Sequence, residues 1–175
     1  MVITQKCVIR YNKKPDIYVQ LNLRKYLPQD LDAIVEIEKK AFPVGPYSRR
    51  MLKRVLNEGG SISVVAELGQ VIAGYAVLLP LNEDQADIET IAVLPEFHGR
   101  GISDRLMEYL EEEALKRSFL EIILEVREKN NRAISFYRRH GYQVISYIPE
   151  FYHEHYEGSR GAFRMSKVLK NRGDR

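Results

Sequence analysis

The sequence predicts one mixed α/β domain. Runs rich in valine, isoleucine and tyrosine alternate with amphipathic segments of helical period, in the order β-α-α-β-β-β-α-β-α-β-β. No internal repeat or low-complexity linker interrupts this order, and 175 residues are enough for one domain with a sizeable core. We therefore expect an N-terminal arm or extra strand over residues 1–20, a single domain over 21–169 and a disordered tail over 170–175.

The first half of the chain carries one strand, two helices and a hairpin. Residues 21–26 read as a strand, and the segment Pro28-Gln29-Asp30 opens a helix that Phe42-Pro43 ends. Ser48 is placed to cap a second helix, which Gly59-Gly60 stops. The runs 61–67 and 71–79 have the spacing of an antiparallel hairpin.

The second half contains a strand over 87–94, a helix over about 102–116, a strand over 119–126 and two closing strands over 142–148 and 161–169. Ser103 or Asp104 is expected to cap the long helix, whose apolar stripe recurs every fourth residue. Asn130 is expected to cap a short helix through Arg139, with Gly141 at its C-terminal end.

Composition excludes several classes of protein. The single cysteine, Cys7, excludes an intrachain disulfide framework and a cysteine-built metal site, which fits a reducing cytoplasm. No apolar run approaches the roughly 18 residues that span a bilayer. The net charge of +3 would tolerate a polyanionic ligand without requiring nucleic acid. We expect a cytoplasmic monomer or dimer that binds neither membrane nor nucleic acid directly.

The stretch IAVLPEFHGRGISDRLM, residues 91–107, joins an apolar strand to a helix through a glycine-bearing loop. The first turn of a helix leaves backbone N–H groups without intrahelical acceptors, and the helix dipole adds positive charge there. Gly99 and Gly101 allow a ligand to approach the backbone, and Arg100 adds a fixed charge. The pattern therefore favours an anion site, although similar loops also serve as plain connections. The loop lacks the Gly-Lys-Ser/Thr of the Walker motif, and its glycine spacing does not match the dinucleotide-binding fingerprint, so neither an NTPase nor a dehydrogenase is favoured.

A second motif, LEVREKNNRAISFYRRHGY, places Glu125 at a strand end, Asn130 at a helix start and Tyr137 two turns later. Together with the glycine loop, it resembles the GNAT superfamily of acetyl-CoA-dependent N-acetyltransferases. Within it, the chain resembles the branch that acetylates protein N-termini, including the ribosomal-protein alanine enzymes and their archaeal relatives. The resemblance implies the acyl-CoA N-acyltransferase fold, a mostly antiparallel sheet flanked by helices, with acetyl-CoA as co-substrate.

The resemblance also assigns the residues that hold acetyl-CoA. The backbone before the loop would pair with the pantetheine arm, the loop and the helix start would hold the pyrophosphate, and the second motif would contact the pantetheine and the thioester. His98 and Ser103 depart from the family's pattern at the two outer loop positions. The implied residues are Ile91, Ala92, Val93, His98, Gly99, Arg100, Gly101, Ile102, Ser103, Asp104, Asn130, Ala133 and Tyr137.

Two carboxylates compete for the role of general base. Glu125 aligns with the base of the ribosomal-protein branch, and its alternative role is a strand-end charge paired with Arg127 or a helix residue. Glu89, with Asp87 on the same strand face, is the reserve. The resemblance implies that Tyr137 protonates the leaving thiolate and that an N–H near Ala92 holds the oxyanion.

The acceptor implied by this branch is a free α-amino group of a protein or peptide, such as a ribosomal or chromatin protein. With a pKa of about 8, roughly a tenth of it is neutral near pH 7, far more than of a lysine at about 10.4. Tyr47, Tyr152 and Tyr156 are the expected acceptor contacts. We expect no metal at His153 and His155. Lysine or polyamine acetylation remains an alternative, and a non-catalytic acetyl-CoA-binding module is a further one.

Overall fold

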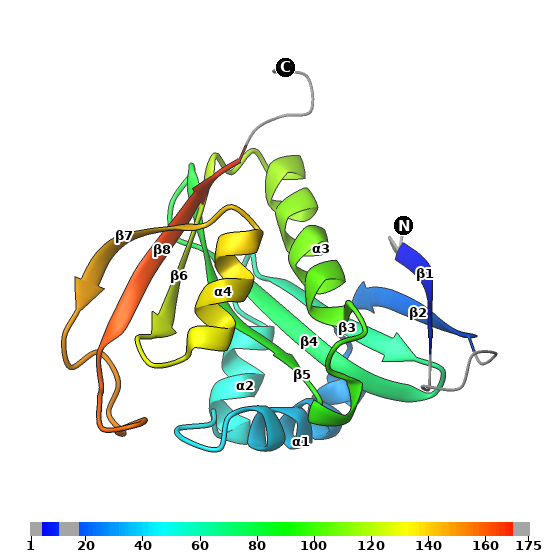
Figure 1. The fold of residues 1–175 in the computed structure, drawn as a ribbon. Coiled ribbons are helices and arrows are strands. Elements are labelled where there is room, and N and C mark those ends of the chain that lie inside the picture. The colour runs from blue at the N-terminus through cyan, green and yellow to red at the C-terminus, as the bar shows by residue number, and fades with distance from the viewer. Residues whose placement is uncertain (1–4, 11–17, 170–175) are drawn as a thin grey trace. The chain divides into compact units, whose positions relative to one another are not determined.

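The computed structural model describes residues 5–10 and 18–169, so the predicted disordered tail lies outside the described residues, as do parts of the predicted arm. The chain forms two compact units. Unit 1 comprises Met1–Leu79 and Glu89–Glu113, and unit 2 comprises Pro80–Ile88 and Ala114–Arg175. Figure 1 shows their elements.

Unit 1 is built on antiparallel strands in the order β1-β2-β3-β4, followed by β5. Their bounds are β1 Gln5–Arg10, β2 Tyr18–Lys25, β3 Ile62–Leu68, β4 Val71–Pro80 and β5 Gln85–Val93. The predicted hairpin is confirmed, because β3 and β4 pair antiparallel from Ile62↔Leu78 to Leu68↔Val71. Strand β2 begins before the predicted residue 21, and β1 pairs along it, as Figure 1 shows in blue.

Two helices lie between β2 and β3. A 3-10 turn, Pro28–Asp30, leads into α1 Leu31–Ala41, and α2 spans Arg49–Leu56. The predicted Ser48 cap is confirmed, since its hydroxyl accepts the backbone N–H of Met51 at 3.3 Å. Fully buried side chains of these helices and strands form the core of the unit. They include Leu21, Leu23, Ile34, Ile37, Leu52, Val64, Val65 and Tyr75.

Helix α3 spans Ile102–Lys116, as predicted, after a 3-10 turn at Pro95–Phe97. Its cap residue differs from the prediction. The helix already includes residue 102, and the N–H of Arg105 bonds to the carbonyl of Gly101 at 3.1 Å. Ser103 and Asp104 therefore lie inside the first turn, and neither occupies the cap position.

Unit 2 contains β6 Glu121–Arg127, α4 Asn131–Arg139, β7 Gln143–Ile148 and β8 Ala162–Val168. Its strand order is β5-β6-β8-β7. The β6, β8 and β7 pairings are antiparallel, whereas β5 and β6 are parallel over three residue pairs that end at Asp87↔Ile123. The mixed, mostly antiparallel α/β fold predicted from the sequence is thus confirmed.

The predicted caps of α4 are present. The Asn130 side chain accepts the N–H of Ala133 at 3.1 Å, which satisfies a donor in the first turn. Gly141 follows the helix with a φ of 88°, a left-handed conformation that glycine adopts without strain. These two local signals set the ends of α4, and Tyr137 lies in its second turn with 8% of its surface exposed.

Candidate active site

The glycine loop of unit 1 presents bare backbone to open space. Gly99 and Gly101 have φ angles of 74° and 76°, so both require glycine for conformational reasons. A Cβ added at either glycine would meet no atom within 4 Å. The loop therefore leaves free volume beside its backbone at the start of α3, which fits a close-approaching anion.

The side chains around this loop brace it. His98 lies with its Nε2 at 2.8 Å from the carbonyl oxygen of Val93, and Arg100 donates to the carbonyl of Glu96 at 3.1 Å. The Arg100 guanidinium also lies 5.2 Å from the centre of the Phe97 ring. His98 departs from the loop pattern of the superfamily that the sequence resembles, and here its ring links the loop to the end of β5. Ile102 is buried, and Ser103 and Asp104 are half-buried.

Strand β5 alternates along its length between buried and half-buried residues. Asp87, Glu89 and Ile91 are half-buried, whereas Ala92 and Val93 are buried. Gly74 of β4 lies so close to this strand that a Cβ on it would come within 2.8 Å of the Ala92 carbonyl oxygen. The end of β5 is fixed by the N–H of Leu94, which bonds to the carbonyl of Ala73 at 2.9 Å.

Glu89 has a partner that the sequence did not indicate. The hydroxyl of Tyr47 donates to Glu89 Oε1 at 2.7 Å, and the backbone N–H of Tyr47 donates to Glu38 Oε1 at 2.9 Å. The structure therefore brings a predicted acceptor contact, Tyr47, to the reserve base, Glu89, inside unit 1. Tyr47 belongs to the segment between α1 and α2, two elements that Figure 1 labels.

Glu125 of unit 2 is paired, although with a different residue from the one considered in the sequence. Arg164 on β8, its direct cross-strand neighbour, donates through Nε to Glu125 Oε1 at 2.6 Å. The alternative pairing of Glu125 with Arg127 is therefore wrong. Arg127 lies on the same face of β6 two residues further on, but its guanidinium contacts the loop between β7 and β8. The β8 register brings Arg164 opposite Glu125 instead. Register is set by tertiary pairing, so Arg164 gave no local signal.

Tyr137 is a buried phenol among aromatic and charged groups of unit 2. Burial raises its pKa, and the electrostatic influence of Tyr152 and Asp87 raises it further. Its ring centre lies 5.4 Å from that of Phe136 and 6.0 Å from that of Tyr142. A phenol with a raised pKa keeps its proton at neutral pH, as a general acid must.

Tyr152 belongs to the same cluster. Burial raises its pKa to about 12, against the opposing influence of Arg127 and with further raising by Glu125 and Asp87. The Arg127 guanidinium lies 3.9 Å from the centre of the Tyr152 ring, a cation–π contact. Unit 2 thus brings two predicted site residues, Glu125 and Tyr137, into electrostatic range of Tyr152, and adds Asp87 and Arg127.

Arg127 also organises the loop between β7 and β8. It donates to the carbonyl of Glu154 at 2.9 Å and lies 5.8 Å from the centre of the Tyr156 ring. Tyr156 forms an isolated bridge with Ser159, closing the tip of that loop. The two predicted acceptor tyrosines of this loop therefore share one cation, a role that the sequence did not assign to Arg127.

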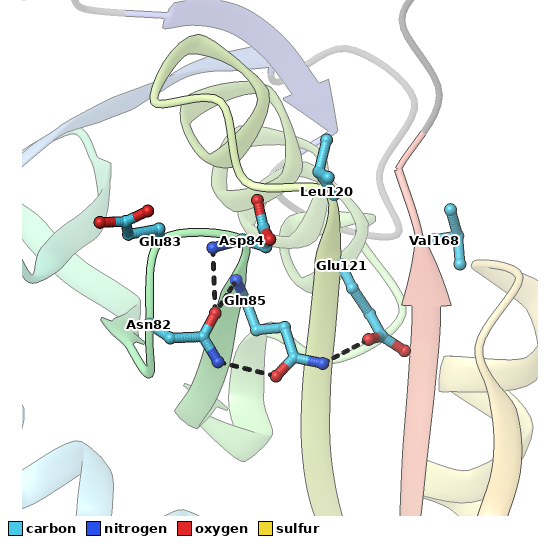
Figure 2. A pocket seen from close by; sticks show the side chains of 7 residues that line it. All are labelled: Asn82, Glu83, Asp84, Gln85, Leu120, Glu121 and Val168. Carbon is cyan, nitrogen blue, oxygen red and sulfur yellow. Dashed lines mark hydrogen bonds between the residues drawn. The ribbon is translucent and has the colours of Figure 1, made fainter.

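A hollow in unit 2 lies apart from the residues predicted for the site. Figure 2 shows its lining, in which Asn82 accepts from the N–H groups of Asp84 and Gln85 at 2.9 Å, and Gln85 donates to Glu121 at 2.7 Å. Glu121 starts β6, whereas Glu125 lies near its end.

In the described ranges, no group of three histidine, cysteine or acidic side chains could hold a metal ion. No helix there has the length and apolarity to cross a membrane.

Comparisons with known proteins agree on one family. A model of the acetyltransferase (GNAT) family matches residues 31–142. A Methanocaldococcus jannaschii protein described as an uncharacterized N-acetyltransferase is 32% identical over 150 residues, which cover 85% of this chain and 92% of that protein.

Solved structures show the same fold. The ribosomal-protein-S18-alanine N-acetyltransferase of Escherichia coli superposes with a TM-score of 0.77 at 25% identity, covering 88% of this chain and 97% of that one. Ard1 of Thermoplasma volcanium gives a TM-score of 0.78 at 22% identity, covering 86% and 99%. Both matches extend over most of each chain.

Proposed function

The chain belongs to the acetyltransferase (GNAT) family and is an acetyl-CoA-dependent N-acetyltransferase, and we propose that its acceptor is the free α-amino group of a protein or peptide. The observation that carries the proposal is the arrangement in unit 2 of a paired carboxylate, Glu125, and a buried phenol, Tyr137. These are the two residue types that direct transfer to an amine requires, one to take a proton and one to give a proton.

The glycine loop fits the pyrophosphate of acetyl-CoA. The free volume beside Gly99 and Gly101 admits a phosphate to the backbone, and the N-terminus of α3 favours its charge. In this assignment Arg100, Ser103 and Asp104 lie at the rim of the phosphate site, and Ile91, Ala92 and Val93 supply backbone groups to the pantetheine arm. Asn130 and Ala133 would contact the pantetheine from the start of α4.

Bound acetyl-CoA supplies an activated acetyl thioester. In the proposed reaction Glu125 takes a proton from the acceptor amine, directly or through water, as the nitrogen bonds to the acetyl carbon. The carbon–sulfur bond then breaks, and Tyr137 gives its phenolic proton to the departing thiolate. The phenol of Tyr137 carries its proton before the step, as this role requires.

Two features support an N-terminal acceptor. The alanine N-acetyltransferase of Escherichia coli matches nearly the whole chain at 25% identity. A free α-amino group also needs only a modest base, since its pKa of about 8 lies close to neutral pH and well below that of a lysine. We propose protein N-termini, including those of ribosomal or chromatin proteins, as acceptors, with Tyr47, Tyr152 and Tyr156 as contacts. We place the reaction in the cytoplasm, which the single cysteine of the chain suits.

The test is an acceptor panel with acetyl-CoA. Peptides with varied first and second residues would be incubated beside N-blocked peptides that contain lysine and beside spermidine, and the acetylated position would be mapped by mass spectrometry. We expect acetylation at free N-termini. Exclusive acetylation of lysine side chains or of spermidine would assign the alternative acceptors, and the absence of transfer with retained acetyl-CoA binding would indicate a binding module.

A further inference from the structure

A buried carboxyl group, Glu38, holds both ends of the segment that carries Tyr47. Its backbone carbonyl accepts the N–H of Phe42 at 2.9 Å, where the segment leaves α1. Its side-chain Oε1 accepts the N–H of Tyr47 at 2.9 Å, just before α2 begins. Glu38 is only 3% exposed, so these bonds are shielded from water.

The second oxygen of Glu38 is anchored in the core. Oε2 accepts a short hydrogen bond from the hydroxyl of Tyr75 on β4, and that hydroxyl lies 3.4 Å from Thr90 Oγ1 on β5. Tyr75 has none of its surface exposed. The Glu38 carboxyl group is therefore fixed from one side by the core and fixes the Tyr47 backbone on the other.

The Tyr47 side chain continues this series of contacts to β5. Its hydroxyl donates to Glu89 Oε1 at 2.7 Å, and Glu89 is half-buried. Among the described residues, Tyr47 is the one hydrogen-bond donor recorded for this carboxylate. The orientation of Glu89 thus depends on a phenol whose own backbone is held by a residue nine positions earlier.

We propose that Glu38 is a positioning residue for the acceptor, because it holds Tyr47 so that the phenol orients the Glu89 carboxylate toward the acceptor's ammonium group. This inference rests on the proposed transfer to an amine. It assigns to Glu89 the recognition of a positively charged acceptor, whereas Glu125 keeps the role of base. Glu38 acts through Tyr47 and touches neither acetyl-CoA nor the acceptor.

Glu38 can position Tyr47 without carrying a charge, so the positioning requires no particular pH. Burial raises the pKa of Glu38, and the hydrogen bonds from Tyr75 and from the Tyr47 backbone oppose that rise. A neutral side chain that keeps an oxygen acceptor should therefore serve as well. Glutamine has this property and nearly the same shape, whereas methionine has similar volume and no strong acceptor.

The experiment compares Glu38→Gln, Glu38→Met and Tyr47→Phe with the wild type. KM for the acceptor, KM for acetyl-CoA and kcat would be measured on whichever amine the wild-type protein acetylates in the panel. We expect Tyr47→Phe and Glu38→Met each to raise the acceptor KM about tenfold, the effect of losing one charge-assisted hydrogen bond. KM for acetyl-CoA should stay unchanged, and Glu38→Gln should stay within about twofold of the wild type.

A double variant tests whether Glu38 acts through Tyr47. If it does, Glu38→Met combined with Tyr47→Phe raises the acceptor KM no further than the larger single change. Additive effects, or a folded Glu38→Met protein with a wild-type acceptor KM, would overturn the inference. If Glu38→Met does not fold, a wild-type acceptor KM in Tyr47→Phe overturns it alone. Failure of the proposed function would appear separately, as the wild-type protein acetylating only amines other than N-termini.

Discussion

Arg164 and Glu125 face each other across the β6–β8 ladder and form a hydrogen-bonded ion pair, with Nε and Oε1 separated by 2.6 Å. The carboxylate side chain is 15% exposed, and the arginine side chain is 42% exposed. Because Glu125 is held by one oxygen, its orientation is fixed while the other oxygen can meet an amine or a water. The ion pair thus orients the carboxylate of the proposed base.

Replacing the base itself should have the largest effect on chemistry. In Glu125→Gln the shape is kept and the proton acceptor is lost, so we expect kcat to fall about 10²- to 10⁴-fold. Arg164→Met, which removes the partner alone, should lower kcat less, by about tenfold, because the carboxylate remains but is no longer aimed. Steady-state kinetics would check both, with acetyl-CoA affinity as the internal control. Wild-type turnover in Glu125→Gln would transfer the role of base to Glu89.

Tyr137→Phe removes one hydroxyl and keeps the buried ring. We expect kcat to fall about 10²-fold or more, since the thiolate must then leave without a general acid. Acetyl-CoA affinity should be nearly unchanged, because the ring still packs beside Phe136 and Tyr142. Tyr142→Phe is a matched control from the same aromatic cluster. Equal losses in both variants would show a packing role rather than proton transfer.

Gly101→Ala tests the phosphate loop. The added Cβ would meet no protein atom, so the cost to folding is the strain of a left-handed alanine, about 1 to 2 kcal/mol. The methyl group would occupy the volume that we assign to the pyrophosphate. We expect KM for acetyl-CoA to rise about tenfold or more, while the acceptor KM changes little. Gly59→Ala is the control for replacing a glycine outside this loop, because a Cβ added there also meets no atom within 4 Å.

Glu38 should make the stability of the protein depend on pH. Burial raises its pKa above the ordinary value of 4.5, so its contribution to the free energy of unfolding is full below that pH and is lost as the pH rises through the folded-state pKa. Glu38→Gln should remove this pH-dependent loss of stability, because a glutamine side chain does not titrate. Denaturant unfolding of both proteins between pH 4.5 and pH 8 should show the variant gaining stability relative to the wild type as the pH rises. A constant difference would contradict the prediction.

Tyr152 should make the protein sensitive to alkali. Its pKa is raised from 10.0 to about 12, so its stabilising contribution is full below pH 10 and is lost as the pH rises toward 12. Spectroscopic titration of phenolate formation, compared between the wild type and Tyr152→Phe, should show one tyrosine fewer titrating near pH 12. If the variant instead has one tyrosine fewer titrating near pH 10, Tyr152 titrates as an exposed phenol and the prediction is contradicted.

Local chemistry in the sequence was sufficient for most of the secondary structure. The turn at Pro28 before α1, the Ser48 and Asn130 caps and the glycine turns act over three or four residues, so their effects can be read from the chain. The bounds of α3 were also predicted correctly, but its cap was not, because the first helical bond of α3 runs from the N–H of Arg105 to the carbonyl of Gly101. The motifs around Gly99–Gly101 and Tyr137 also predicted the family.

The tertiary structure decided the partners of the charged groups. Arg164 lies 39 residues from Glu125, and Glu89 lies 42 residues from Tyr47, so only strand register and packing could join them. The same holds for the buried Glu38, which looks like an ordinary helix glutamate in the sequence. A hydrogen bond depends on distance and direction in space, and the sequence by itself specifies neither for residues so far apart.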